Sequence, residues 1–402
     1  MKRIQSKAAL LKKRVRAVQG KAKFAGLLYL LGTIALAAVA ALVVFVRGAY
    51  ISPTEGELMM FKSVIDEATF LVMGDGTVGG VKAVLQDAEL LMRAVVLLIY
   101  AVMLLVAVIN VFRCLGKLGW LFKRRASYSN GFNRNAYAMD DMSKRYSSSL
   151  AAIIVCNLLI FALGGVGFTQ LGYFAIIGGV VLHLLAGLVE GKVTLFTTGE
   201  KMEEEEREHG LFVFFVRNIL QLAVLAGIFL FFVCNPFEVN ESTSANTTNT
   251  VLGSVLLEVL DLAVVQRDFG ALMNMQLLVP FAVEVFVWIS LIVLIKHATA
   301  ATEFNRDGLD GTGMKNFAAF AFIGAVCLAG LALLPMFGFG EWLNVAESEM
   351  NNNLIIAAAI AFVGFLLDCF VRPRVRGSYD DVDTDAYFSD GYEQPKYNNT
   401  IV

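Results

Sequence analysis

The chain carries at residues 24–46 the run FAGLLYLLGTIALAAVAALVVFV, which contains no charged residue. A helix needs about 20 apolar residues to cross the hydrocarbon layer of a bilayer. Strands of a membrane barrel alternate apolar and polar residues, and this run shows no such alternation. The stretch therefore predicts a transmembrane helix.

The composition of the whole chain agrees with this interpretation. Hydrophobic residues make up 57% of the chain and charged residues 17%, against roughly 45–50% and about 25% in soluble proteins. Further apolar blocks bring the expected spans to eight: 24–46, 90–112, 149–166, 172–190, 211–233, 277–296, 317–337 and 354–371. The predicted fold class is an all-α integral membrane protein with about eight transmembrane helices.

Lysine and arginine are distributed unevenly between the segments that join these spans. If both termini lie inside, the inner segments, counted together with Lys296 at the inner end of the sixth span, carry 27 of the 33 Lys and Arg, and the outer segments carry four. Basic residues favour the cytoplasmic side of a membrane. The pattern predicts cytoplasmic N- and C-termini, and we expect the protein in the plasma membrane.

A repeated tripeptide indicates that the chain contains two copies of one unit. The sequence Phe-Asn-Arg occurs at 132–134 and again 172 positions later, at 304–306. After a single-residue gap the correspondence continues, because Val-Cys at 155–156 and Gly-Phe at 167–168 return with an offset of 171. The repeated residues are Phe132, Asn133 and Arg134 in the first copy and Phe304, Asn305 and Arg306 in the second.

The repeat divides the chain into two halves of four spans each. Four spans return the chain to its starting side, so the two tandem repeats are parallel, with an axis along the membrane normal. Residues 64–68 and 259–263 resemble each other and predict an amphipathic helix in the long outer segment of each half. The expected regions are a basic amphipathic segment (1–23), the first repeat (24–192), an acidic cytoplasmic linker (193–210), the second repeat (211–371) and a disordered acidic tail rich in tyrosine (372–402).

The basic and acidic segments suggest partners at the inner surface. Residues 1–23 predict a helix that lies on anionic inner-leaflet lipids, with a plain topogenic signal as the alternative. The basic aromatic stretch in 113–148 favours a juxtamembrane anchor over nucleic-acid binding. The tyrosines of the tail suggest a docking site for a protein partner, with a solubilising tail as the alternative.

Ionisable residues within spans are costly to bury and are functional candidates by default. Glu284 lies about a third of the way into the sixth span, where it would bind a cation or a proton, or else remain a protonated packing residue. Arg217 and His183 lie at a similar depth near the inner surface, which permits contact between them. His183 has an alternative role as a hydrogen-bonded core residue.

No pattern in the sequence indicates enzymatic chemistry. The five cysteines do not cluster with the three histidines, and hydrolase and metalloprotease motifs are missing. We therefore expect no metal, no cofactor and no catalytic activity.

Two function classes follow from these observations. One is a transporter or channel-like protein with a path between the two repeats, and the other is a non-catalytic scaffold or assembly factor. A cavity that reaches Glu284 would favour transport. For the repeated tripeptide, we expect inner loops that clasp helix ends, and the alternative is a simple turn that needs asparagine.

Overall fold

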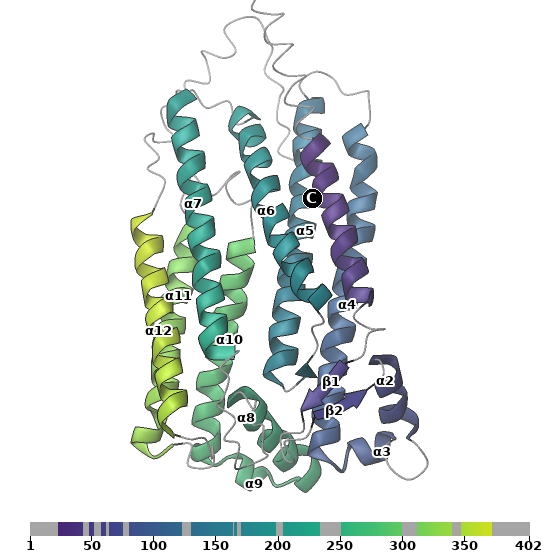
Figure 1. The fold of residues 1–402 in the computed structure, drawn as a ribbon, viewed down its shortest axis with the longest axis vertical. Coiled ribbons are helices and arrows are strands. Elements are labelled where there is room, and N and C mark those ends of the chain that lie inside the picture. The colour runs from purple at the N-terminus through teal and green to yellow at the C-terminus, as the bar shows by residue number, and fades with distance from the viewer. Residues whose placement is uncertain are drawn as a thin grey trace, which may run out of the picture.

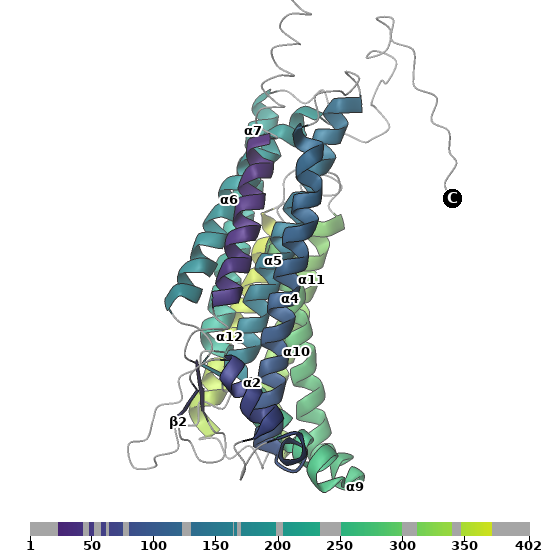
Figure 2. The same ribbon diagram turned by 90° about the vertical axis from the view of Figure 1, so that its right-hand side faces the viewer.

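The computed structural model describes residues 23–42, 48–51, 58–61, 64–74, 80–122, 130–163, 165–166, 170–197, 204–233, 251–299, 312–339 and 347–371. The long helices run roughly along the longest axis of the molecule (Figures 1 and 2). Within these ranges, seven helices are long and apolar enough to cross a membrane. The chain is therefore an all-α, multi-pass integral membrane protein.

The first half begins with the helix Lys23–Leu42 and ends with α6. Its other elements are β1 (Gly48–Ile51), β2 (Leu58–Phe61), α2 (Val64–Met73), α3 (Val81–Val84), α4 (Ala88–Phe122), α5 (Asn130–Ala162), β3 (Gly165–Val166) and α6 (Gln170–Thr197).

The second half begins with α7 and ends with α12. Its elements are α7 (Glu204–Ile228), the π-helix η1 (Phe229–Val233), α8 (Val251–Leu260), the π-helix η2 (Asp261–Gln266), α9 (Phe269–Leu272), α10 (Met275–Thr299), α11 (Thr312–Leu333), the 3-10 helix η4 (Leu334–Phe337) and α12 (Glu347–Phe370).

The eighth expected span, 172–190, lies within α6, which is 28 residues long. The stretch Phe174–Val189 of this helix is apolar but shorter than the seven other candidates. In Figure 1, α6 runs beside α5 and α7 along the same axis.

The inner segment 113–148 is largely helical, which corrects the expectation of a loop there. Helix α4 continues to Phe122, and α5 begins at Asn130, so the first Phe-Asn-Arg copy at 132–134 lies in the first turns of α5. The length of an apolar run indicates how much of a helix lies in lipid. It does not indicate where the helix ends. Beyond the apolar part, Met142 and Tyr146 are fully buried and continue the packing of α5.

The segments that were expected outside the membrane contain helices at both predicted positions, α2 at 64–68 and the junction of α8 and η2 at 259–263. They also contain strands that the sequence pattern did not predict. Strand β1 pairs antiparallel with both β2 and β3, in a sheet of order β2-β1-β3. The strands have two to four residues, which is too short for alternation to be recognised. Helices α2, α3, α8 and α9 and strands β1 and β2 lie at one end of the bundle (Figure 1).

Aromatic side chains and glycines hold the helices of the first half together. The rings of Tyr29 and Tyr146 lie 5.6 Å apart, and the hydroxyl of Tyr146 donates a hydrogen bond to the carbonyl of Gly179 in α6. A Cβ on Gly32 would lie 2.5 Å from Leu182. The first and fourth spans of this half therefore approach each other through a glycine, as is common between membrane helices.

The first and fourth spans of the second half also meet at glycines. A Cβ on Gly364 of α12 would lie 2.6 Å from Val224 of α7, and one on Gly227 would lie 3.0 Å from Ile360. Gly338 ends η4 with φ 74, a left-handed conformation that favours glycine. The equivalence of the two halves stays a prediction, and these similarities are consistent with it.

The main contacts between the two halves join α5 to α10 and η1, α6 to α7, and α4 to α8 and η2. The predicted N-terminal amphipathic segment (except Lys23), the acidic tail beyond Val371 and the second Phe-Asn-Arg copy lie outside the described residues. The clasp proposed for the repeated tripeptide is therefore still a prediction.

Candidate functional site

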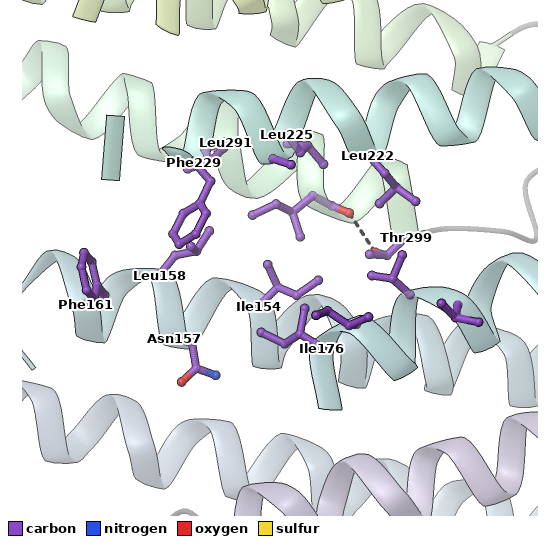
Figure 3. Close-up of a pocket in the computed structure, with 15 residues that line it drawn as sticks. Ile154, Asn157, Leu158, Phe161, Ile176, Leu222, Leu225, Phe229, Leu291 and Thr299 are labelled. Atoms are coloured by element: carbon purple, nitrogen blue, oxygen red, sulfur yellow. Dashed lines mark hydrogen bonds between the residues drawn. The ribbon is translucent and has the colours of Figure 1, made fainter. Parts of the chain in front are cut away.

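A cavity of about 350 Å³ lies between the two halves of the protein. Helices α5 and α6 line it from the first half, and α7, η1 and α10 line it from the second (Figure 3). This volume is at the lower end of the range of small-molecule pockets. The lining residues include Ile154 and Asn157 of α5, Ile176 of α6, Leu222 and Leu225 of α7, and Thr299 of α10.

Each helix contributes one face to the cavity. Leu222 and Leu225 on α7 and Phe229 at the start of η1 follow helical spacing. On α10, Leu291, Ile295 and Thr299 do the same. Almost all of these side chains are aliphatic or aromatic. The site is therefore suited to an apolar molecule or to the apolar part of a larger one.

The two polar residues of the lining make their hydrogen bonds mainly within their own helices. The hydroxyl of Thr299 donates to the carbonyl of Ile295, at 2.8 Å, the contact drawn in Figure 3. The Nδ2 of Asn157 donates to the carbonyl of Ile153, at 2.6 Å, and approaches the sulfur of Met103 on α4. Figure 3 shows the Asn157 amide turned away from the other lining side chains.

Polar residues lie next to the end of the cavity that Thr299 of α10 lines. His183 of α6 is 1% exposed and interacts with Asn218 of α7 and the backbone of Ala298 in α10. The Nδ2 of Asn218 donates to the carbonyl of Ala298, at 2.9 Å. Neither ring nitrogen of His183 has a hydrogen-bonding partner among the residues that the structure describes.

Arg217 binds Asp368 of α12 rather than His183. The Nε and Nη2 of Arg217 donate to the two carboxylate oxygens of Asp368, both at 2.6 Å. Gln221 also donates to Asp368, at 2.9 Å. Both charged side chains are at least 96% buried, so the pair joins α7 to α12 without facing the cavity.

Asp368 was missed in the sequence as a partner for Arg217. The only available signal was its position as a lone carboxylate in the last expected span, 354–371. Two opposite charges in separate spans of one half are a possible pair, but their contact depends on the rotation of both helices.

Glu284 is fully buried in α10 and does not line the cavity. The indole of Trp288, one helical turn further along, is a neighbouring donor, and the Trp288 ring lies 5.7 Å from that of Phe232. Neither carboxyl oxygen of Glu284 makes a hydrogen bond within the described ranges. The structure thus separates Glu284 from His183 and Arg217, although all three were candidates for one path. The cavity does not reach Glu284, so the observation that was expected to favour transport through this residue is not made.

Arg93 has a structural environment at the outer end of α4. Its guanidinium forms an ion pair with Glu67 of α2 and lies 5.4 Å from the ring centre of Phe70. These contacts attach α2 to α4.

The described side chains contain no group of three or more His, Cys, Asp or Glu residues that would hold a metal ion. The chain matches no protein-family profile, no curated protein and no solved structure.

Proposed function

We propose that the protein is a transporter without enzymatic activity, and that it moves a hydrophobic molecule through the interface between its two halves. The observation that carries this proposal is the apolar cavity of about 350 Å³ between α5 and α6 on one side and α7 and α10 on the other. Sites near the interface of two repeats are typical of transporters.

The chemistry of the lining favours a hydrophobic substrate over an ion. An ion inside the hydrocarbon layer needs charged or polar groups to replace its water. No charged residue lines this cavity, and the hydroxyl of Thr299 is already bonded to its own helix. The site would therefore accept an apolar group and reject a bare cation.

The position of the cavity supports entry from the lipid. Ile177 and Val181 line it from α6 and are 60% and 50% exposed. Ala226 is an exposed lining residue on the facing helix, α7. On this proposal, a hydrophobic molecule enters sideways between α6 and α7.

The end of α7 offers an element that can change shape beside the cavity. The helix passes directly into the π-helix η1, whose first residue, Phe229, lines the cavity. Such π-segments occur frequently at functional sites, because their wider hydrogen bonding is less stable than that of an α-helix.

A pair of tryptophan variants tests this proposal with a matched control. Ala226→Trp places a large side chain in the cavity, whereas Ala223→Trp, three residues earlier on α7, places it on the exposed face outside the lining. In proteoliposomes, the transfer of a fluorescent fatty alcohol should be lost with Ala226→Trp and kept with Ala223→Trp. Equal transfer by the two variants would show that the cavity is not the path.

The scaffold function is the second candidate, and the length of α4 and α5 favours it. These helices have 35 and 33 residues, so each is about 50 Å long and extends beyond a hydrocarbon layer of about 30 Å. A projecting helical pair offers a surface for protein partners. If parental protein moves no lipid-like probe in proteoliposomes, the scaffold function becomes the better proposal.

A further inference from the structure

Polar side chains continue the lining faces of the cavity at its Thr299 end. His183 follows Ile176 by seven residues on α6, and Asn218 precedes Leu225 by seven residues on α7. Residues seven apart lie on nearly the same face of an α-helix. His183 and Asn218 do not line the cavity themselves, but together with the lining residue Thr299 they place a polar region next to one of its ends, called the polar end below.

Helix α5 contributes to the same end. Ser147 precedes the lining residue Ile154 by seven positions, and Ser143 lies one turn further along the same face. Both serines are at least 93% buried. Their hydroxyl oxygens have no hydrogen-bonding partner in the part of the chain that the structure describes.

The imidazole of His183 belongs to this polar end, and neither of its ring nitrogens makes a hydrogen bond of good geometry to a described residue. It lies beside Asn218 of α7 and Ala298 of α10, which belong to the two helices that line the cavity from the second half. Burying both ring nitrogens without a partner is costly. A ligand that hydrogen bonds to the ring would remove this cost.

The polar end lacks a formal charge to pair with an ionic head group. The adjacent Arg217 is directed to Asp368, so it is engaged elsewhere. A small uncharged head group that donates and accepts hydrogen bonds suits an imidazole, an amide and hydroxyls. A phosphate head group suits them less well, because its charge would have no partner. The cavity volume of about 350 Å³ suits one hydrocarbon chain rather than two.

We infer that the cavity binds a single-chain amphiphile, a long-chain alcohol or a protonated fatty acid, with its hydroxyl group against His183 and its chain along the apolar lining. This inference deepens the proposed function and rests on its placement of the substrate between the two halves. It adds the class of the ligand and the direction in which the ligand lies.

A competition experiment on the purified full-length protein in nanodiscs tests the inference. Bound tritiated hexadecan-1-ol is displaced by unlabelled hexadecan-1-ol or by n-hexadecane, which has the same chain without a head group. We expect the alcohol to bind about five- to tenfold more tightly than the alkane, the effect of one or two hydrogen bonds to a buried site. Equal affinities would overturn the inference.

Variants at the polar end identify the residue responsible. His183→Leu should lower the affinity for the alcohol about fivefold or more and leave that for the alkane unchanged, whereas His183→Gln should keep most of the preference. The melting temperature without ligand shows whether each variant is folded. If His183→Leu does not fold, Ser147→Ala and Thr299→Val are measured in the same way, and an unchanged alcohol preference in both would overturn the inference.

The assay also separates this inference from the transport function. If the parental protein prefers the alcohol and loses this preference with His183→Leu, the inference stands, even if proteoliposomes show no transfer and the transport function is wrong. If transfer occurs but alcohol and alkane bind equally, transport stands and the ligand class is wrong.

Discussion

The buried ion pair of Arg217 and Asp368 is the residue-scale contact with the largest expected effect on stability. Replacing one partner leaves the other charge buried and unpaired, which costs about 3–5 kcal/mol. Asp368→Asn should therefore strongly lower the melting temperature of the detergent-solubilised protein. An apolar double replacement, Arg217→Met with Asp368→Leu, should recover most of this loss, because it removes both charges.

Asp141 provides the matched control for this prediction. It pairs with Arg145 and Lys117 at 3.4 Å, but its side chain is 26% exposed. Water screens such pairs, so Asp141→Asn should cost about 1 kcal/mol or less. Similar melting temperatures for Asp141→Asn and Asp368→Asn would mean that burial of the Arg217 pair is not important for stability.

Glu284 gives the second residue-scale prediction. Its carboxyl is fully buried and does not border the cavity, and an isolated ionised carboxyl would be far more costly there than a neutral acid. Glu284→Gln keeps the shape of the side chain and, like the protonated acid, carries no charge. We therefore expect the variant to have the melting temperature of the parental protein and to transfer a lipid-like probe at the same rate. Loss of transfer in a folded Glu284→Gln variant would instead give Glu284 a role in proton or cation coupling.

At the scale of elements, α2 is fastened to α4 by a few side chains. Glu67 of α2 pairs with Arg93 of α4, and Leu71 packs in a small cluster with Val84 and Leu90. Glu67→Gln removes the charge but keeps the size of the side chain. Hydrogen exchange should become faster in α2 and stay unchanged in α10, because α2 has few other contacts to hold it. Equal exchange in parent and variant would show that the apolar cluster alone holds α2.

A comparison of the expected spans with the observed helices shows that an apolar run locates the membrane part of a helix but not its ends. Each of the eight expected spans coincides with a helix over most of its length, because the thickness of the hydrocarbon layer fixes how many apolar residues are needed. The third span, 149–166, was drawn too long, since α5 ends at Ala162 and residues 165–166 form β3. The ends were wrong for α4 and α5, which continue to Phe122 and begin at Asn130. Outside lipid, a helix is stabilised by side-chain packing such as that of Met142. The length of the apolar run then no longer indicates where the helix ends.

At the scale of the whole molecule, the predicted orientation is open to a direct test. Single cysteines replacing Ser129, Thr312 or Ser389 in a cysteine-free background should resist a membrane-impermeant thiol reagent in intact cells. Cysteines replacing Thr77 or Thr243 should react, because the excess of Lys and Arg places these segments outside. Labelling at position 312 from outside would contradict both the orientation and the parallel repeat.

The internal repeat belongs to the same scale and stays a prediction. In both halves the first and fourth spans meet at a glycine, through Gly32 in the first and Gly364 in the second. Tyr146 and Phe317, which are 171 positions apart, are both at least 99% buried. These features are what a duplicated unit would show, whereas the Arg217–Asp368 pair occurs in the second half.

The sequence by itself determined that the chain is an all-α, multi-pass membrane protein, because the absence of water in lipid forces long apolar helices that satisfy their own backbone. It also identified Glu284, His183 and Arg217 as unusual. Only the tertiary structure decided that Arg217 binds Asp368, that His183 lies beside Asn218 and that Glu284 has no place in the cavity. These outcomes depend on the rotation of each helix about its axis, and in lipid an apolar helix carries little pattern to fix that rotation, since buried and exposed faces are equally apolar.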